Sequence, residues 1–222
     1  MDPHHQVVEL LAGVPLFWAL DERVLRELAA RLPQRVVAKG AAIFVQEEPG
    51  DRMFVLAEGM VKLVVRSSRG DVIELVRHRP PAVFGEVAVL DGGPRSATAE
   101  AVQRSRLIVI ARDEFLRLLR SDVQVADALL GSLGDMVRRT TRQLSDLVFL
   151  DMQGRVARQL LQLADDDTSL SSVTQSELAD MIGGARQSVN LALRRLEQRG
   201  HIRAAGKDIE ILDHDALRRA SE

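Results

Sequence analysis

The chain has 222 residues, of which 46% are hydrophobic and 28% charged, and its formal net charge at pH 7 is −2. Such a length suits one large domain or two small ones, and the near-neutral charge excludes a general polyanion binder, so any nucleic-acid contact requires a local basic patch. The absence of Cys excludes disulfides, thiolate metal sites and Cys-ligated iron–sulfur clusters. Because no apolar run reaches membrane-spanning length and the N-terminus lacks a basic-then-apolar signal pattern, we expect a cytoplasmic protein without membrane contact.

The first half of the chain changes from helical to strand periodicity. Apolar residues recur at helix-like spacing through residues 1–32, with Pro15 and Pro33 as breaks. Short β-rich runs then occupy residues 36–37, 42–45, 53–56, 61–65, 72–76 and 107–110. Many short strands at this spacing predict a sandwich, roll or barrel, and Gly59 and Gly70 lie where hairpins would require φ > 0.

The segment from Phe84 to Thr98 has the residue types of a small site for an anion and a sugar. A short helix that starts near Gly85 would leave backbone N–H groups free at its positive end, where a phosphate can bind. Arg95 could neutralise that phosphate with a forked contact, Ser96 could add a hydroxyl donor, and Glu86 could hold a ribose 2′-OH. Each residue alone is more typical of a turn or a solvated surface, so the prediction rests on the ordered set.

A long helix is predicted after Phe115, with Ser121 or Asp122 as its cap. Its apolar positions are spaced alternately by four and three residues, as in the heptad seam of a coiled coil. The seam comprises Ala126, Leu130, Leu133, Val137, Thr140, Leu144 and Leu147. Since no other apolar helix of similar length is evident, the simplest partner is a second copy, which gives a two-fold dimer; packing against the chain's own sheet is the alternative. Thr140 is a polar residue on this seam, a position that often sets register or serves a ligand.

The segment that follows the long helix is predicted to be a hinge at residues 151–154, a short amphipathic helix up to Ala164, and a loop at 165–172. Three consecutive Asp residues in this loop do not point at one centre, so we predict no metal site there.

Residues 174–212 have the pattern of a winged helix-turn-helix. Residues 174–177 (Thr-Gln-Ser-Glu) form a capping box at the start of a first helix that ends at the Gly pair 183–184. A second helix runs from about Ala185 to Arg199, with Gly200 as its stop. Two short helices joined by a Gly-containing turn are typical of helix-turn-helix proteins, and residues 201–212 fit the small hairpin of a wing.

The second of these helices carries side chains suited to DNA. Its outward face presents Arg186, Gln187, Asn190 and Arg194, which can bond base edges or phosphates. From Arg186 to Arg203 there are five Arg and a single acid, which supplies the local basic patch that the net charge requires.

The ordered set Phe-Gly-Glu at 84–86 and Pro-Arg-Ser-Ala-Thr at 94–98 closely resembles the phosphate-binding cassette of cyclic-nucleotide-binding domains, in particular those of the Crp/Fnr family of bacterial transcription regulators. The resemblance covers about residues 16–212 and includes Phe149-Leu150-Asp151. It implies an α+β fold with three parts: a jelly-roll-like β-roll domain over residues 1–120, a dimerisation helix over 121–150, and a winged helix-turn-helix domain over 151–222.

The resemblance also implies site residues and partners. The effector is expected to be cAMP rather than cGMP, with Thr140 and Thr141 contacting the purine and one of them reaching across the dimer. The partners are double-stranded DNA with two-fold related half-sites, a second copy of the chain, and RNA polymerase. The nucleotide-binding residues are Gly85, Glu86, Arg95, Ser96, Thr140 and Thr141. The DNA-binding residues are Thr174, Gln175, Ser176, Arg186, Gln187, Ser188, Asn190 and Lys207.

The chain departs from the family pattern at several positions. Pro81-Ala82 stands where Gly-Asp is usual and Glu47 replaces a common Gly, so we expect an altered turn at each place. In the recognition helix, Gln187 replaces a Glu that accepts from cytosine N4; Gln suits adenine better, whereas Arg186 suits a bidentate contact with guanine. Leu191 replaces a frequent Arg, so the target sequence is expected to differ from the best-known one.

The hypothesis is therefore a homodimeric, cAMP-responsive DNA-binding regulator that acts by a population shift. The alternative is a constitutive regulator, or one with another effector, whose nucleotide pocket is vestigial. An enzyme is not expected because the sequence shows no paired carboxylates, no nucleophile–base arrangement and no Walker loop. A haem-sensing variant would need axial ligands, for which His78 is the single candidate.

Overall fold

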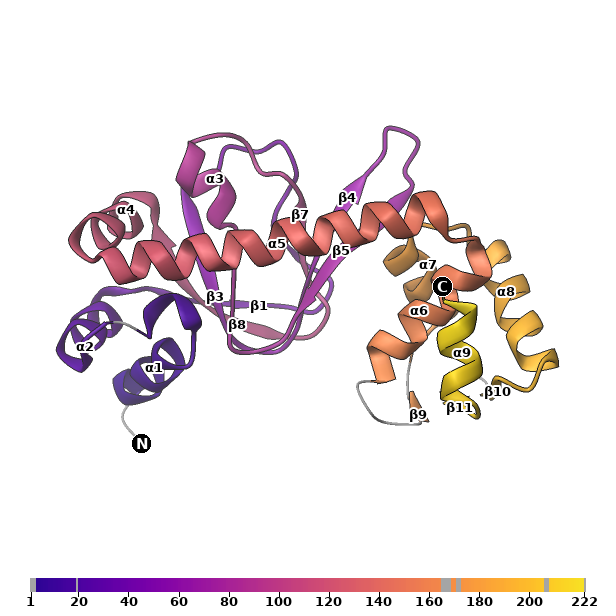
Figure 1. Ribbon diagram of the computed structural model, residues 1–222. Helices are drawn as coiled ribbons and strands as arrows, with labels where there is room; N and C mark the ends of the chain where they lie inside the picture. Colours follow the sequence, from indigo (N-terminus) through magenta and orange to yellow (C-terminus); the bar gives the residue numbers. More distant parts are fainter. Residues whose placement is uncertain (1–2, 19, 165–168, 171–172, 206–207, 222) are drawn as a thin grey trace. The chain divides into compact units, whose positions relative to one another are not determined.

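The computed structural model describes residues 3–18, 20–164, 169–170, 173–205 and 208–221. The chain forms two compact units (Figure 1). Unit 1 consists of residues 1–66 and 75–137, and unit 2 consists of residues 67–74 and 138–222. None of the described helices is both long enough and apolar enough to cross a membrane.

The first part of the chain is helical and then becomes a roll of short strands, as predicted. Two four-stranded sheets have the strand orders β1-β8-β3-β6 and β2-β7-β4-β5, so strands distant in sequence are neighbours in each sheet. The helices are α1 (Pro3–Ala12), η1 (Pro15–Phe17), α2 (Glu22–Arg31), α3 (Glu86–Asp91), α4 (Arg112–Ser121) and α5 (Val123–Phe149). The strands are β1 (Gln34–Val37), β2 (Ala42–Phe44), β3 (Arg52–Glu58), β4 (Val61–Arg66), β5 (Val72–His78), β6 (Ala82–Phe84), β7 (Thr98–Ala101) and β8 (Ser105–Ala111).

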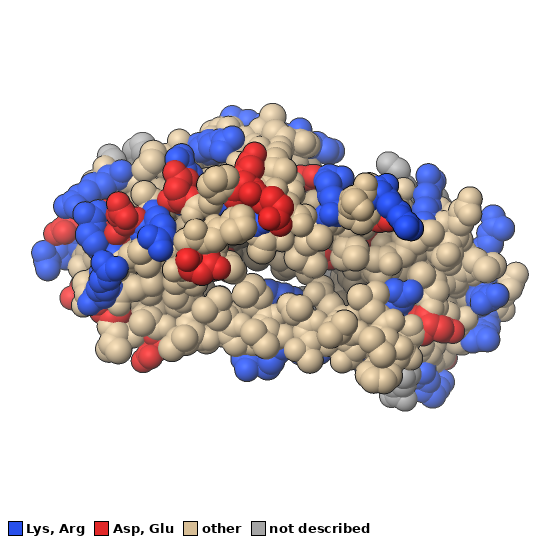
Figure 2. Space-filling view, turned by 90° about the horizontal axis from the view of Figure 1, so that it is seen from above, with Lys and Arg blue, Asp and Glu red and all other residues tan. Residues whose placement is uncertain are grey.

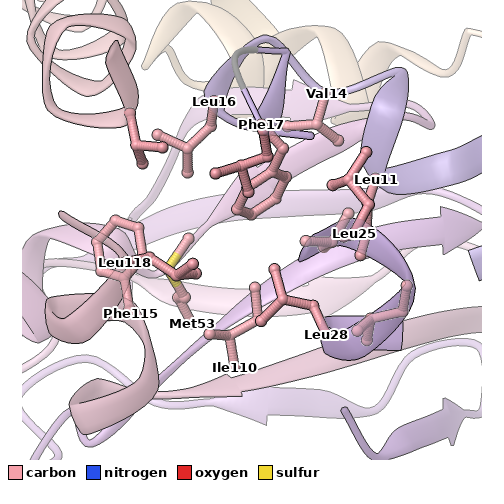
Figure 3. Close-up of a cluster of buried hydrophobic side chains, with 14 of the residues drawn as sticks. Leu11, Val14, Leu16, Phe17, Leu25, Leu28, Met53, Ile110, Phe115 and Leu118 are labelled. Carbon is pink, nitrogen blue, oxygen red and sulfur yellow. The ribbon is translucent and has the colours of Figure 1, made fainter. Parts of the chain in front are cut away.

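One apolar core fastens the N-terminal helices to the first sheet. Phe17 of η1 and Phe115 of α4 are fully buried together with Met53 of β3 and Ile110 of β8 (Figure 3). Val125 and Leu129, in the first turns of α5, belong to the same cluster. Burial of side chains of this size contributes roughly 1.5–3 kcal/mol each, so the beginning of α5 is held firmly on unit 1.

A second core fills the space between the two sheets. Phe44, Phe54 and Phe84 come from three different strands, and the rings of Phe54 and Phe84 are stacked with centroids 5.4 Å apart. His78, at the end of β5, is stacked on the outer side of this cluster, 5.9 Å from the Phe84 ring. The aromatic cluster therefore supports the end of β6, directly before Gly85.

The helix that begins at Val123 is capped by Asp122, whose Oδ1 accepts from the backbone N–H of Gln124 at 2.9 Å. This confirms one of the two predicted caps. The ten residues before Asp122 form a separate helix, α4, which the apolar periodicity did not distinguish from α5.

Unit 2 contains the winged helix-turn-helix, as predicted, around one apolar core. Its elements are α6 (Met152–Ala164), β9 (Ser169–Leu170), α7 (Gln175–Ile182), α8 (Arg186–Gln198), β10 (Ile202–Ala205), β11 (Asp208–Ile211) and α9 (His214–Ala220). Strand β9 pairs with β11 within the predicted 165–172 loop, whose residues 165–168 and 171–172 lie outside the described residues. The short helix α9 was not predicted; the Asp213 side chain caps it by accepting from Ala216 N at 2.8 Å.

Candidate functional site

The predicted anion segment forms a tight loop–helix–loop after β6. Gly85 has φ 82° and precedes α3, and Gly92 has φ 72° and ends it. A Cβ atom at Gly85 would lie 2.9 Å from Nη1 of Arg95, closer than real Cβ contacts allow. The left-handed backbone and the close approach both require glycine here, so Gly85 lets the chain pass directly beside the arginine.

Arg95 is the centre of this site. Its exposed fraction is 3%, although arginine is normally at the surface. Nη1 donates to the carbonyl of Gly85 at 2.9 Å, and Nη2 donates to the carbonyl of Arg52 at 2.6 Å. Nε is buried and has no hydrogen-bond partner within the described residues. Because a guanidinium has five N–H donors, Arg95 keeps unused capacity for an anion.

The surroundings of Arg95 are partly apolar. Its guanidinium carbon lies 4.2 Å from the centroid of the Phe44 ring, in a cation–π contact. Burial lowers the pKa of Arg95 from its usual value, while the carboxylates of Asp51, Glu48 and Glu86 act in the opposite direction. The charged guanidinium is thus disfavoured by desolvation, and a bound anion would stabilise it.

A loop after β2 holds the backbone of Arg95 from the other side. Glu47 N donates to the carbonyl of Arg95 at 2.9 Å, and Arg95 N donates to the carbonyl of Glu48 at 2.8 Å. Glu47 has φ 68°, the conformation that glycine adopts most easily. Glu47 stands where the family commonly has glycine, and the turn is nevertheless left-handed. The glutamate therefore adopts a backbone conformation that is unfavourable for a residue with a Cβ atom.

The other predicted nucleotide-binding residues divide between the two units. Glu86 is half-buried at the first position of α3, and Ser96 is exposed next to Arg95. Thr140 and Thr141 are exposed on the part of α5 that belongs to unit 2. The structure thus brings Gly85, Glu86, Arg95 and Ser96 together, and describes the two threonines in a separate unit.

Much of the seam predicted along α5 is an exposed apolar stripe, whereas Leu133 is partly buried against the core of unit 1. Leu130, Val137 and Leu144 are 65%, 61% and 61% exposed, respectively. Val125 and Leu129, on another side of the helix, are buried in unit 1. Two apolar sides on one helix, one of them covered, are what a helix shared between a domain core and a partner requires.

The helix-turn-helix has the predicted local structure. Thr174 Oγ1 accepts from Glu177 N at 3.2 Å, and Glu177 Oε2 accepts from Thr174 N at 2.9 Å, which completes the capping box. Gly183 ends α7 with φ 62°. Gln175 is half-buried and Ser176 exposed in the first turn of α7.

The recognition helix presents its polar side chains outward. Arg186, Gln187 and Ser188 are exposed in its first turn, and Asn190 is half-buried. On the face shown in Figure 2, Lys and Arg side chains are spread over unit 2, at the right of the view, with acidic side chains sparse among them. Lys207, the predicted phosphate contact of the wing, lies outside the described residues.

Comparison with known proteins identifies the family. A model of cyclic nucleotide-binding domains matches residues 34–122, and a model of Crp-like helix-turn-helix domains matches residues 154–220. The "CRP-like cAMP-activated global transcriptional regulator" of Mycobacterium tuberculosis is 33% identical over 219 residues, which cover 95% of this chain and 98% of that protein. The chain belongs to the Crp/Fnr family of transcription regulators.

Solved structures of related proteins have the same architecture. The catabolite activator protein of Thermus thermophilus is 29% identical with a TM-score of 0.56, covering 93% of this chain and 98% of that one. The c-di-GMP responsive global regulator CLP of Xanthomonas campestris has a TM-score of 0.76 at 20% identity, covering 86% and 99%, and shows the fold alone. Crp/Fnr proteins are DNA-binding transcription regulators rather than enzymes.

Sequence reasoning missed three contributors to the Arg95 site. Phe44 lies under the guanidinium, the Arg52 carbonyl accepts from it, and Gly50 lets the chain pass close to it, since a Cβ there would lie 3.2 Å from the guanidinium carbon and closer still to Cβ of Ala88. The aromatic residue and the carbonyl had no recognisable signal, because only the tertiary fold brings positions so far apart in sequence to Arg95.

Proposed function

We propose that this protein is a cytoplasmic, homodimeric transcription regulator that binds cAMP and, in response, a two-fold symmetric DNA site. The observation that carries the proposal is the buried Arg95, whose Nε has no hydrogen-bond partner among the described residues and which Gly85 approaches so closely that a Cβ there would lie 2.9 Å from Nη1. A desolvated, incompletely bonded guanidinium is suited to a cyclic phosphate, which it can contact through charge-assisted hydrogen bonds.

The remaining ligand contacts are proposed from the resemblance to cyclic-nucleotide-binding domains. Glu86 holds the ribose 2′-OH, Ser96 donates to the phosphate, and Thr140 and Thr141 contact the purine. The choice of cAMP is supported by relatives named for it, including the Mycobacterium tuberculosis regulator and the cyclic AMP receptor protein of Thermus thermophilus, which is 30% identical.

The exposed stripe on α5 supports the homodimer. Pairing of Leu130, Val137 and Leu144 with the same residues of a second copy would remove apolar side chains from water and set two recognition helices in two-fold symmetry. The half-sites are then about 34 Å apart, one turn of the DNA helix. RNA polymerase is the further partner that we propose for the DNA-bound dimer.

Calorimetry of the full-length protein tests the effector. We expect cAMP to bind, cGMP to bind more weakly, and c-di-GMP to give no heat. Arg95→Leu should abolish cAMP binding and leave the fold intact by circular dichroism, whereas Arg117→Leu, which removes an exposed arginine of α4, should bind as the wild type does. Undiminished cAMP affinity in Arg95→Leu would show that the pocket is misplaced.

One observation favours the alternative regulator with a vestigial pocket or another effector. Two hydrogen bonds of the Arg95 guanidinium already end on backbone carbonyls, and the side chain is 97% covered without any ligand. Operator binding at fixed salt separates the two functions. Binding that is selective for one sequence but unchanged by cAMP and cGMP would support the alternative and contradict cAMP control.

A further inference from the structure

The recognition helix α8 has one exposed apolar side chain on its polar face. Leu191 is 51% exposed, while the apolar residues Val189, Leu193 and Leu196 of the same helix are buried. At 100° per residue, Gln187, Leu191 and Arg194 fall on one line along the outward side of the helix. Leu191 is therefore flanked by two of the exposed polar side chains of this helix.

This position is poorly explained by packing alone. A single exposed leucine is common on protein surfaces, but those surfaces are not expected to face a polyanion. Gln187 and Arg194 are exposed on either side of Leu191, and the first turn of α8 also exposes Arg186. A surface with this charge fits DNA, and an apolar side chain at its centre must meet an apolar group there.

The major groove offers one such group. Each base pair presents hydrogen-bond donors and acceptors to the groove, and thymine alone adds a methyl group. Leucine cannot donate or accept a hydrogen bond, so it gains nothing from the polar edges of guanine, cytosine or adenine. Leu191 is the sixth residue of α8, within the N-terminal part of a recognition helix that reads bases.

We propose that Leu191 is a specificity-determining residue that selects a thymine in each DNA half-site through its 5-methyl group. The proposal rests on the proposed function, because it concerns the DNA site of the same regulator. Gln187, one turn earlier on the same line, suits adenine, so together the two side chains favour adjacent A·T pairs. Arg186 places a guanine contact nearer the start of the helix.

The test begins with the full-length protein and cAMP, which select a binding site from a random duplex library. Each thymine of the selected site is then replaced by deoxyuridine in both half-sites, a change that removes only the methyl group. Loss of one buried methyl weakens binding by about fourfold, so a symmetric pair of substitutions should weaken it by about 15-fold. We expect this loss at one thymine position for the wild type.

Leu191→Ala assigns the effect to the side chain. The variant should bind the thymine site about 15-fold more weakly than the wild type and should lose no further affinity with deoxyuridine, as in a double-mutant cycle. Val123→Ala is the control, because Val123 is an apolar residue at the start of α5 that is 72% exposed. This variant should keep the full thymine preference.

Two results overturn the inference while leaving the regulator function intact. One is a selective site at which no thymine-to-deoxyuridine change matters, and the other is a preference that persists in Leu191→Ala. Failure of the proposed function is a different result, because then no sequence is selected at all, and the inference fails with it. If the protein selects the same DNA site with and without cAMP, the proposed effector is wrong, but the thymine test remains valid.

Discussion

Arg95 and Glu47 show how single residues in this protein depart from their ordinary behaviour. Arg95 is buried against Phe44 and two carbonyls, and Glu47 adopts a left-handed backbone next to it. The two are connected, since Glu47 N donates to the Arg95 carbonyl and fixes its backbone. Strain in the loop thus occurs where a hydrogen bond holds the backbone of the buried Arg95 in place.

Replacement of Glu47 by glycine should stabilise unit 1. A left-handed conformation costs a non-glycine residue about 1–2 kcal/mol, and glycine removes this cost. Because glycine is more flexible in the unfolded chain, roughly half of that benefit is lost, so we expect the free energy of unfolding to rise by about 0.5–1 kcal/mol. Urea unfolding followed by circular dichroism measures the change.

Glu48→Gly is the matched control for that substitution. Glu48 is not among the residues with positive φ, and its Oε2 accepts from Val45 N at 2.9 Å. Glycine at position 48 should therefore destabilise the protein by about 1 kcal/mol. If both glycine variants lowered stability, the left-handed conformation of Glu47 would carry no strain.

Among the elements, α7 is the one whose start is most completely specified by local chemistry. Its capping box satisfies two backbone N–H groups with the side chains of Thr174 and Glu177. Both bonds lie within four residues, so the helix start needs no distant partner. The recognition helix α8 has no such side-chain cap, and its placement depends on the packing of Val189 and Leu193.

Thr174→Ala should loosen α7 by about 1 kcal/mol, because it removes one side of the capping box. Amide hydrogen exchange at Glu177 and in the following turn should become about fivefold faster. Ser176→Ala changes an exposed hydroxyl of the same turn and should leave the exchange unchanged. Equal exchange in wild type and Thr174→Ala would mean that tertiary contacts alone hold the start of α7.

At the scale of the whole molecule, α5 is the element that both units share. Its first turns are buried in the core of unit 1 through Val125 and Leu129, and it continues into unit 2. The exposed apolar residues of the seam, which are Leu130, Val137, Leu144 and Leu147, form the stripe on which the proposed dimer depends.

A charge in the stripe should separate the proposed dimer. Leu144→Glu places one carboxylate from each copy in an apolar interface, which should raise the dimer dissociation constant on the order of 100-fold or more. Sedimentation equilibrium over a range of concentrations measures the constant. Ser132→Glu adds the same charge at an exposed position of α5 outside the seam and should leave the dimer intact; a monomeric wild type would contradict the proposed assembly.

Local sequence patterns were sufficient for much of the fold. The short β-rich runs predicted β1 to β5 and β8, although not β6 and β7. The threonine–glutamate pair predicted the start of α7, and the spacing of Leu130, Val137 and Leu144 predicted an apolar stripe on a helix. The small elements β9 and α9 were missed because each is too short to show a period. The separate helix α4 was missed because its apolar residues are followed almost directly by those of α5, so the spacing shows no clear break between the two helices.

The sequence by itself determined the family and the order of β-roll, long helix and helix-turn-helix, because glycine, capping residues and periodic apolar residues act through their immediate neighbours. Only the tertiary structure decided that Arg95 is buried, that Phe44 and the Arg52 carbonyl contact it, and that Leu191 stays exposed. The physical reason is that the fold brings together positions more than forty residues apart, as with the Arg95 side chain and the Arg52 carbonyl. Burial is a property of that assembled packing, and no local spacing encodes it.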